Sequence, residues 1–106
     1  MGFFDFLHAP DINEGVELFR STPGALLLDV RTAQEYAGGH IPGSVNIPLQ
    51  ELERAKSVIP AKDTPVFVHC LSGARSRQAA AELKHMGYSN AQNIGGISAW
   101  RGEVQK

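Results

Sequence analysis

One thiol is the strongest candidate for chemistry in this sequence, because Cys70 is the only cysteine among 106 residues. It ends the apolar run VFVHC (66–70) and is followed directly by LSGARS (71–76). A cysteine reacts as its thiolate, which a helix N-terminus or a nearby cation stabilises. Three roles are therefore open for Cys70: an apolar filler of the core, a metal ligand, or a nucleophile in an anion-binding loop.

The residues after Cys70 have the composition of a small-anion site. Four residues separate Cys70 from Arg75, and among them Gly73 permits a backbone conformation in which several N–H groups converge. Arg75 adds a permanent cation. The anion to be held is a thiolate, a persulfide or the oxygens of thiosulfate. The combination of strand, Cys, Gly, Arg, Ser and helix favours a reactive thiolate over an inert structural cysteine.

The elements expected around this loop alternate between strands and helices. Short apolar runs without alternation are typical of strands buried on both faces, and helical spacing of apolar residues separates them. We predict an α/β fold with a mostly parallel central sheet flanked by helices on both faces, which places Cys70 at the carboxyl edge where such sheets bind ligands. The expected strands are 25–30, 66–70 and 91–96, with an extended piece at 45–49; the expected helices are 10–20, 32–37 (a capping box of Thr32 and Glu35), 49–59, 74–86 (stopped by Gly87) and 97–104.

The composition of the whole chain limits the class of protein. Its length fits one domain over residues 1–106, and its net charge of -1 gives no reason to expect nucleic acid or an anionic membrane as a partner. A lone cysteine excludes an internal disulfide and favours a reducing compartment, the cytoplasm. The start MGFFDFLHAP lacks the basic region of a signal peptide, so Phe3, Phe4 and Phe6 are expected to pack on the domain surface. The four histidines and Cys70 show no metal-binding spacing.

Three motifs together resemble a single-domain rhodanese, a sulfurtransferase: LLDVRTAQEYAGGHIPGSVNIPL (27–49), VFVHCLSGARS (66–76) and GYSNAQNIGGISAW (87–100). The resemblance covers roughly residues 10 to 101. It implies that Cys70 takes a sulfane sulfur from thiosulfate or a persulfide and passes it to cyanide or a thiol without a cofactor. It also allows a sulfur-relay protein as a partner. It also implies that the loop holds the transferred sulfur. The substrate-binding residues would be Leu71, Ser72, Gly73, Ala74, Arg75 and Ser76.

Two features of the loop bear on substrate. Related cysteine phosphatases and arsenate reductases have five residues between Cys and Arg, whereas this chain has four, so its smaller ring suits a sulfur atom better than a phosphoryl group. Larger two-domain thiosulfate enzymes have basic side chains where this chain has Leu71, Ser72 and Glu35. We therefore expect thiosulfate to be a poor donor and a persulfide to be the better one. A sulfur carrier or regulatory module with little turnover of its own is the alternative function.

The remaining polar residues near the site have more ordinary explanations. Asp29 and Arg31 end the first buried strand, and the resemblance implies that they and His40 brace the site loops; a direct substrate role for Arg31 stays open. Glu35 is expected to act as the capping-box partner of Thr32 rather than as a catalyst. His69 should point to the opposite sheet face from Cys70, so it is a weak candidate for a general base.

Overall fold

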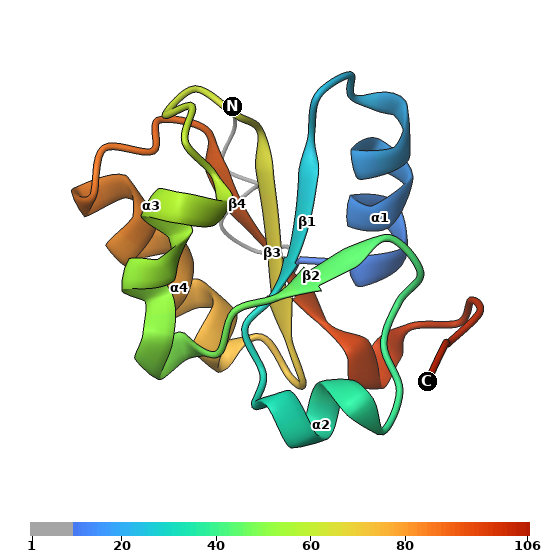
Figure 1. Cartoon of the computed structure of the whole chain (residues 1–106). Helices are drawn as coiled ribbons and strands as arrows, with labels where there is room; N and C mark the ends of the chain where they lie inside the picture. Colours follow the sequence, from blue (N-terminus) through green and yellow to red (C-terminus); the bar gives the residue numbers. More distant parts are fainter. Residues whose placement is uncertain (1–9) are drawn as a thin grey trace.

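Four parallel strands form the centre of the fold, in the order β2-β1-β3-β4. The computed structural model of the chain describes residues 10–106 (Figure 1). β1 pairs in parallel with β2 and β3, and β3 pairs in parallel with β4. The strands are β1 (Leu26–Asp29), β2 (Ser44–Asn46), β3 (Val66–Cys70) and β4 (Ala91–Gly96). This arrangement confirms the predicted α/β fold with its parallel sheet.

Helices cover both faces of the sheet, as predicted, and a short helix lies at one end of it. α1 (Ile12–Ser21) packs on one face, while α4 (Ala74–His85), the 3-10 helix η2 (Leu49–Arg54) and α3 (Ala55–Val58) cover the other. α2 (Ala33–Ala37) follows β1 at the carboxyl ends of the strands, at the bottom of Figure 1. That edge therefore gathers α2, the end of β3 and the start of α4.

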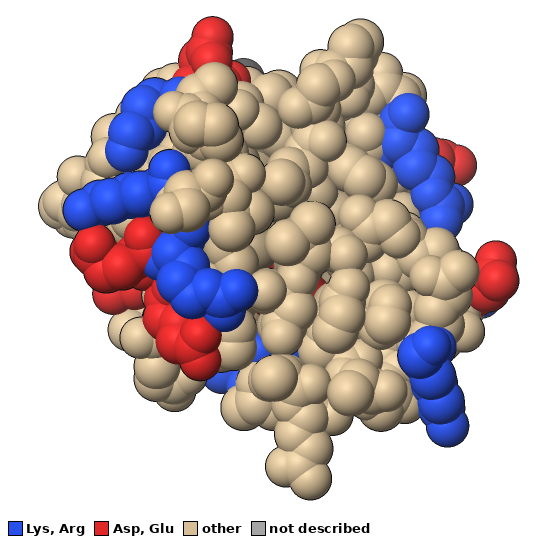
Figure 2. All heavy atoms as spheres, viewed as in Figure 1, with Lys and Arg blue, Asp and Glu red and all other residues tan. Residues whose placement is uncertain are grey.

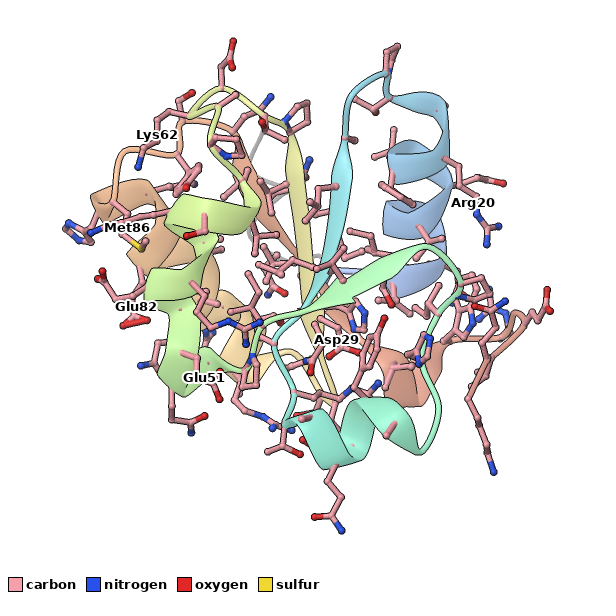
Figure 3. The ribbon with its side chains drawn as sticks, in the orientation of Figure 1. Arg20, Asp29, Glu51, Lys62, Glu82 and Met86 are labelled. Atoms are coloured by element: carbon pink, nitrogen blue, oxygen red, sulfur yellow. The ribbon has the colours of Figure 1, made fainter. Side chains whose placement is uncertain are left out.

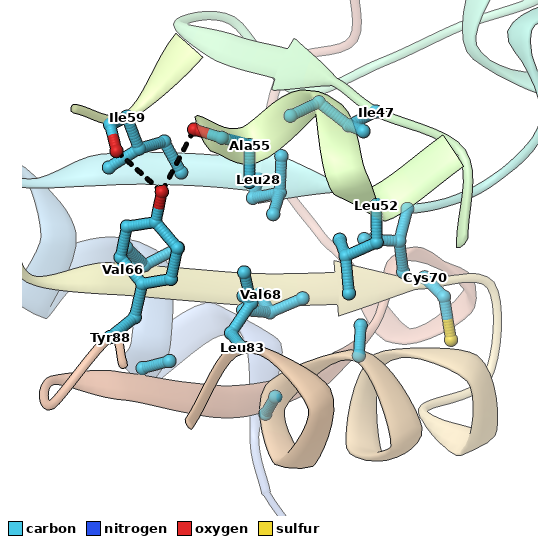
Figure 4. Close-up of a cluster of buried hydrophobic side chains, with 14 residues drawn as sticks. Leu28, Ile47, Leu52, Ala55, Ile59, Val66, Val68, Cys70, Leu83 and Tyr88 are labelled. Carbon is cyan, nitrogen blue, oxygen red and sulfur yellow. Dashed lines mark hydrogen bonds between the residues drawn. The ribbon is translucent and has the colours of Figure 1, made fainter. Parts of the chain in front are cut away.

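The core consists of two apolar clusters, one on each side of the sheet. The cluster under α4 and α3 contains Leu28, Val68 and Cys70 on the strands (Figure 4). The fully buried Tyr88 belongs to the same cluster, and its hydroxyl lies 3.0 Å from Ala55 O and 2.6 Å from Ile59 O. The cluster under α1 is formed by Ile12, Val16, Leu27, Ile41, Phe67 and Ile94.

Local signals in the sequence account for several helix ends. Asp11 caps α1 by accepting a hydrogen bond from Asn13 N, and Thr32 and Glu35 form the predicted capping box on α2. Gly87 has a φ of 104° directly after the C-cap of α4, so the predicted stop signal is also confirmed.

Two predicted helices differ in the structure. The segment 49–59 begins as the 3-10 helix η2, in which the backbone of Glu51 has non-helical angles, and only Ala55–Val58 is α-helical. The helix expected over 97–104 is reduced to the 3-10 turn η3 (Ile97–Ala99). Trp100 is extended and its indole donates to Glu103 O, and Gln105 then pairs with His40 in an antiparallel bridge.

Some expectations for the amino terminus cannot be compared with the structure. The predicted surface packing of Phe3, Phe4 and Phe6 lies outside the described residues. Among residues 10–106, the structure contains no helix that has both the length and the apolar character needed to span a membrane.

Candidate functional site

The Cys70 thiol lies inside a tight loop between β3 and α4. Its sulfur accepts a hydrogen bond from Gly73 N at 3.0 Å and lies 3.4 Å from Ser76 Oγ. Gly73 has a φ of 107°, a conformation that glycine adopts without a steric penalty, and this turns its N–H toward the sulfur. The residue is only 1% exposed, so a reagent must enter the loop to reach the sulfur.

Opposing effects act on the protonation of this thiol. Burial raises the pKa of Cys70, but hydrogen bonds from the Ser76 hydroxyl and from the backbone amides of Ser76, Gly73 and Ser72 lower it, and together they outweigh burial. The net result is a Cys70 pKa below the ordinary thiol value. The loop can therefore stabilise negative charge on sulfur, which is the property that a nucleophilic cysteine needs.

The Arg75 side chain pairs with an acidic residue of α2. Its guanidinium makes a bidentate pair with Glu35, with Nη1–Oε1 and Nη2–Oε2 distances of 2.8 and 3.0 Å. Arg75 therefore keeps the predicted permanent charge, but the carboxylate of Glu35 balances it. Glu35 also accepts from Thr32 N at 2.8 Å, so it both caps α2 and neutralises Arg75. The Arg75 hydrogen bonds hold the pKa of Glu35 down to about 2.

Asp29 and Arg31 form a buried ion pair at the carboxyl end of β1. Figure 3 labels Asp29, which lies between β2 and α2 in that view. Arg31 donates to Asp29 through Nε and Nη2, and Nη2 also donates to Gly39 O at 2.8 Å. Asn46 Nδ2 donates to the backbone oxygens of both residues at 2.9 Å. These contacts tie β1, β2 and the loop after α2 together, as a bracing role requires. The guanidinium of Arg31 has no contact with the Cys70 loop among these bonds.

The two described histidines near the site lie away from the sulfur. His40 stacks on Tyr36 with 3.9 Å between ring centroids, and its Nδ1 lies 3.0 Å from Tyr36 O. His69 is fully buried beside Asp29, with 3.7 Å between Nε2 and Oδ2. Burial lowers the pKa of His69 and outweighs the Asp29 carboxylate, which raises it. Both environments fit packing better than proton transfer at Cys70.

Asn93 on β4 is a site residue that sequence reasoning missed. Its Oδ1 lies 2.6 Å from Ser76 Oγ and accepts a hydrogen bond from Gly95 N at 3.0 Å. Alternation along β4 places Asn93 on the same sheet face as the buried Ala91, so a polar residue on the α4 side of a buried strand was the available signal.

Gly96 was also missed, although the sequence ends β4 with two glycines. A Cβ at Gly96 would lie 2.2 Å from Leu71 O, so only glycine lets the loop pack this closely on β4. Ser98 N donates to the same oxygen at 3.0 Å. A hollow of about 430 Å³ adjoins this contact and is lined by residues including Ser72, Gly73 and Asn93, but Cys70 does not line it.

The surface charges on the side of the molecule covered by α3 and α4 are mixed. Figure 2 shows charged side chains of both signs along the α3 and α4 flank and an uncharged area in the middle of the same face.

Within residues 10–106, no three His, Cys, Asp or Glu side chains are grouped closely enough to hold a metal ion. The chemistry that this arrangement can support is thus nucleophilic attack by a stabilised thiolate.

Comparisons with known proteins agree with this geometry. The family described as "Rhodanese-like domain" matches residues 13–103. The chain is 45% identical over 80 residues to a "Sulfurtransferase" of Allochromatium vinosum, a match that covers 74% of each protein. It is 41% identical over 71 residues to "Thiosulfate sulfurtransferase PspE" of Escherichia coli, covering 66% of this chain and 68% of the relative. It spans 64% of the length of the Bacillus subtilis protein YqhL, with 40% identity over 82 residues.

A solved structure shows the same fold. The structure described as "rhodanese with anions from E. coli" superimposes with a TM-score of 0.72 and 36% sequence identity, and the match covers 77% of this chain and 98% of that one.

Proposed function

Since the chain belongs to the rhodanese-like domain family, we propose that it is a sulfurtransferase that carries a sulfane sulfur as a Cys70 persulfide. The observation that carries this proposal is the loop itself, in which a backbone amide and the Ser76 hydroxyl converge on a buried sulfur with a lowered pKa. Fixed donors of this kind stabilise a negative charge before and after transfer without a general base.

The proposed reaction has two displacements at sulfur. The Cys70 thiolate attacks the outer sulfur of the donor, the donor's sulfur–sulfur bond breaks, and sulfite or a thiolate leaves with the bonding electrons. A cyanide ion or an acceptor thiolate then attacks the terminal sulfur of the persulfide and regenerates the Cys70 thiolate. No net oxidation of the protein occurs over the cycle.

The loop residues have separate roles in this proposal. The amides from Leu71 through Arg75 hold the terminal sulfur, and the hydroxyls of Ser72 and Ser76 add donors to it. The loops around the site are held in place by Asp29, Arg31 and His40. The contacts of these residues with β1, β2 and α2 favour this role.

The charge at the loop favours a persulfide donor over thiosulfate. Leu71 is 45% exposed and presents an apolar side chain, and the cation of Arg75 is neutralised by Glu35. A dianion such as thiosulfate therefore meets little net positive charge here. We also propose that the acceptor is an external thiol, because the chain has no second cysteine that could attack a Cys70 persulfide. A lone cysteine, which forms no internal disulfide, also fits a reducing compartment, the cytoplasm.

Intact mass spectrometry tests the proposal directly. Incubation with thiosulfate or glutathione persulfide should add one sulfur atom to the wild-type chain and none to Cys70→Ser, and cyanide should remove it. A wild-type chain that gains no sulfur from either donor would refute the proposed chemistry. Loading without turnover would instead identify a sulfur carrier that needs a partner protein. Hydrolysis of an aryl phosphate that is lost in Cys70→Ser would identify a phosphatase.

A further inference from the structure

The hydroxyl of Ser76 has one proton and four acceptors around it. Ser76 Oγ lies 2.6 Å from Asn93 Oδ1, 3.1 Å from Gly73 O, 3.3 Å from Gly95 O and 3.4 Å from Cys70 Sγ. Ser76 is fully buried, so its hydroxyl has no contact with bulk water. A serine hydroxyl donates only one hydrogen bond at a time. The sulfur therefore competes with three oxygens for this proton.

The orientation of the Asn93 amide decides which oxygen holds the proton. Gly95 N is a donor and lies 3.0 Å from one atom of the amide, so that atom must be the oxygen. The same oxygen faces Ser76 Oγ, so the short 2.6 Å contact is a bond that Ser76 donates and Asn93 accepts. The amide nitrogen faces Gly73 O at 3.5 Å. With a neutral thiol, the Ser76 proton thus belongs to Asn93.

We propose that Asn93 is a positioning residue that controls the Cys70 thiolate by competing for the Ser76 hydroxyl proton. When Cys70 is a neutral thiol, Ser76 donates to Asn93. When the sulfur is charged, as thiolate or persulfide, a charge-assisted bond becomes the stronger one and the hydroxyl turns to the sulfur. Asn93 Oδ1 keeps its bond from Gly95 N in both states, so this oxygen is never left without a donor.

The proposal rests on Cys70 being the nucleophile of the proposed function, and it adds the residue that tunes that nucleophile. It predicts that loss of Asn93 changes the Cys70 pKa in the opposite direction from a general disruption of the loop. Loss of Asn93 removes the best competing acceptor and makes the Ser76 proton more available to sulfur, so the Cys70 pKa should fall. Loosening of the loop would withdraw amides from the sulfur and raise the pKa instead.

The rate of Cys70 alkylation by iodoacetamide, measured against pH without a sulfur donor, tests the proposal. Asn93→Ala should lower the midpoint by about half a pH unit, and Ser76→Ala should raise it by about one unit. In the Ser76→Ala background, Asn93→Ala should produce no further shift. Gln92→Ala, an exposed change on the same strand, serves as the matched control and should leave the midpoint unchanged.

A midpoint that rises or stays constant in Asn93→Ala would overturn the proposal, as would an equal shift with and without Ser76. If Asn93→Ala does not fold, Asn93→Asp keeps both acceptor oxygens and binds the hydroxyl more strongly. It should raise the midpoint more in the presence of Ser76 than in its absence, and equal shifts would again refute the role. The alkylation assay uses no sulfur donor, so its outcome does not depend on whether Cys70 can be loaded with sulfur. Failure of the proposed sulfurtransferase function would therefore appear only in the mass-spectrometry experiment.

Discussion

Replacement of Glu35 by glutamine should convert the Cys70 loop into a better thiosulfate site. In the wild type, Glu35 neutralises Arg75 through two bonds of 2.8 and 3.0 Å. Glutamine keeps an oxygen that can accept from Thr32 N, so the cap of α2 survives, but it leaves Arg75 with an uncompensated positive charge. A unit charge and a dianion about 7 Å apart attract by about 1 kcal/mol in water and by about 2 kcal/mol at half that dielectric constant.

These energies correspond to a gain of about 5- to 30-fold in kcat/KM for thiosulfate. The gain should shrink as salt is raised from 0.01 to 0.15 M, because the screening length falls to about 8 Å. An uncharged organic trisulfide should show little change as donor. The cost in folding free energy should be about 1 kcal/mol or less, since the two side chains are 31% and 32% exposed.

Glu51→Gln is the matched control for this experiment. It makes the same chemical change in a surface ion pair with Arg54, whose side chains are both 54% exposed, and it should leave thiosulfate kinetics unchanged. The reasoning is refuted if Glu35→Gln fails to speed loading from thiosulfate, or if loading from the uncharged trisulfide rises by the same factor.

Three further results are expected. Gly73→Val should abolish persulfide loading while circular dichroism stays native-like, because φ at residue 73 is 107°; retained loading would contradict this. Asp29→Asn should lower the unfolding free energy by about 3–5 kcal/mol in urea titrations, because Arg31 is left buried without its counter-charge. The pKa of Glu35 is lowered to about 2, so the contribution of Glu35 to the free energy of unfolding is complete above pH 4.5 and is lost as pH falls toward 2. The difference in urea midpoint between wild type and Glu35→Gln should shrink over that range, and a constant difference would argue against the pair.

The sequence allowed the sheet and the loop to be predicted because their signals are local. VFVHC marks β3, the capping box marks α2, and Gly73 marks the turn under the sulfur. The partners of charged side chains were harder to predict, because Arg75 and Glu35 lie 40 positions apart in the sequence and no local pattern relates them. The helix expected at 97–104 failed for a similar reason, because a pairing between Gln105 and His40 competes with helical hydrogen bonds there.

The contact between Ser76 and Asn93 also could not be predicted from the sequence. Each residue has an ordinary local explanation, a serine in the first turn of a helix and an asparagine in a strand. Their contact depends on the packing of α4 against β4, which brings Ser76 Oγ within 2.6 Å of Asn93 Oδ1. Only the assembled fold reveals that the Ser76 hydroxyl donates a hydrogen bond to Asn93.

The burial of the Cys70 sulfur also has a consequence for how long a bound sulfur would survive. Free persulfides are consumed by abundant small thiols because both sulfur atoms are open to attack, and the rate of such exchange depends on access. Cys70 is 1% exposed, so small thiols in solution have little access to the inner sulfur of a Cys70 persulfide. Attack is then restricted to the outer sulfur, so the lifetime of a bound sulfur would depend on whether an acceptor can reach that one atom inside the loop.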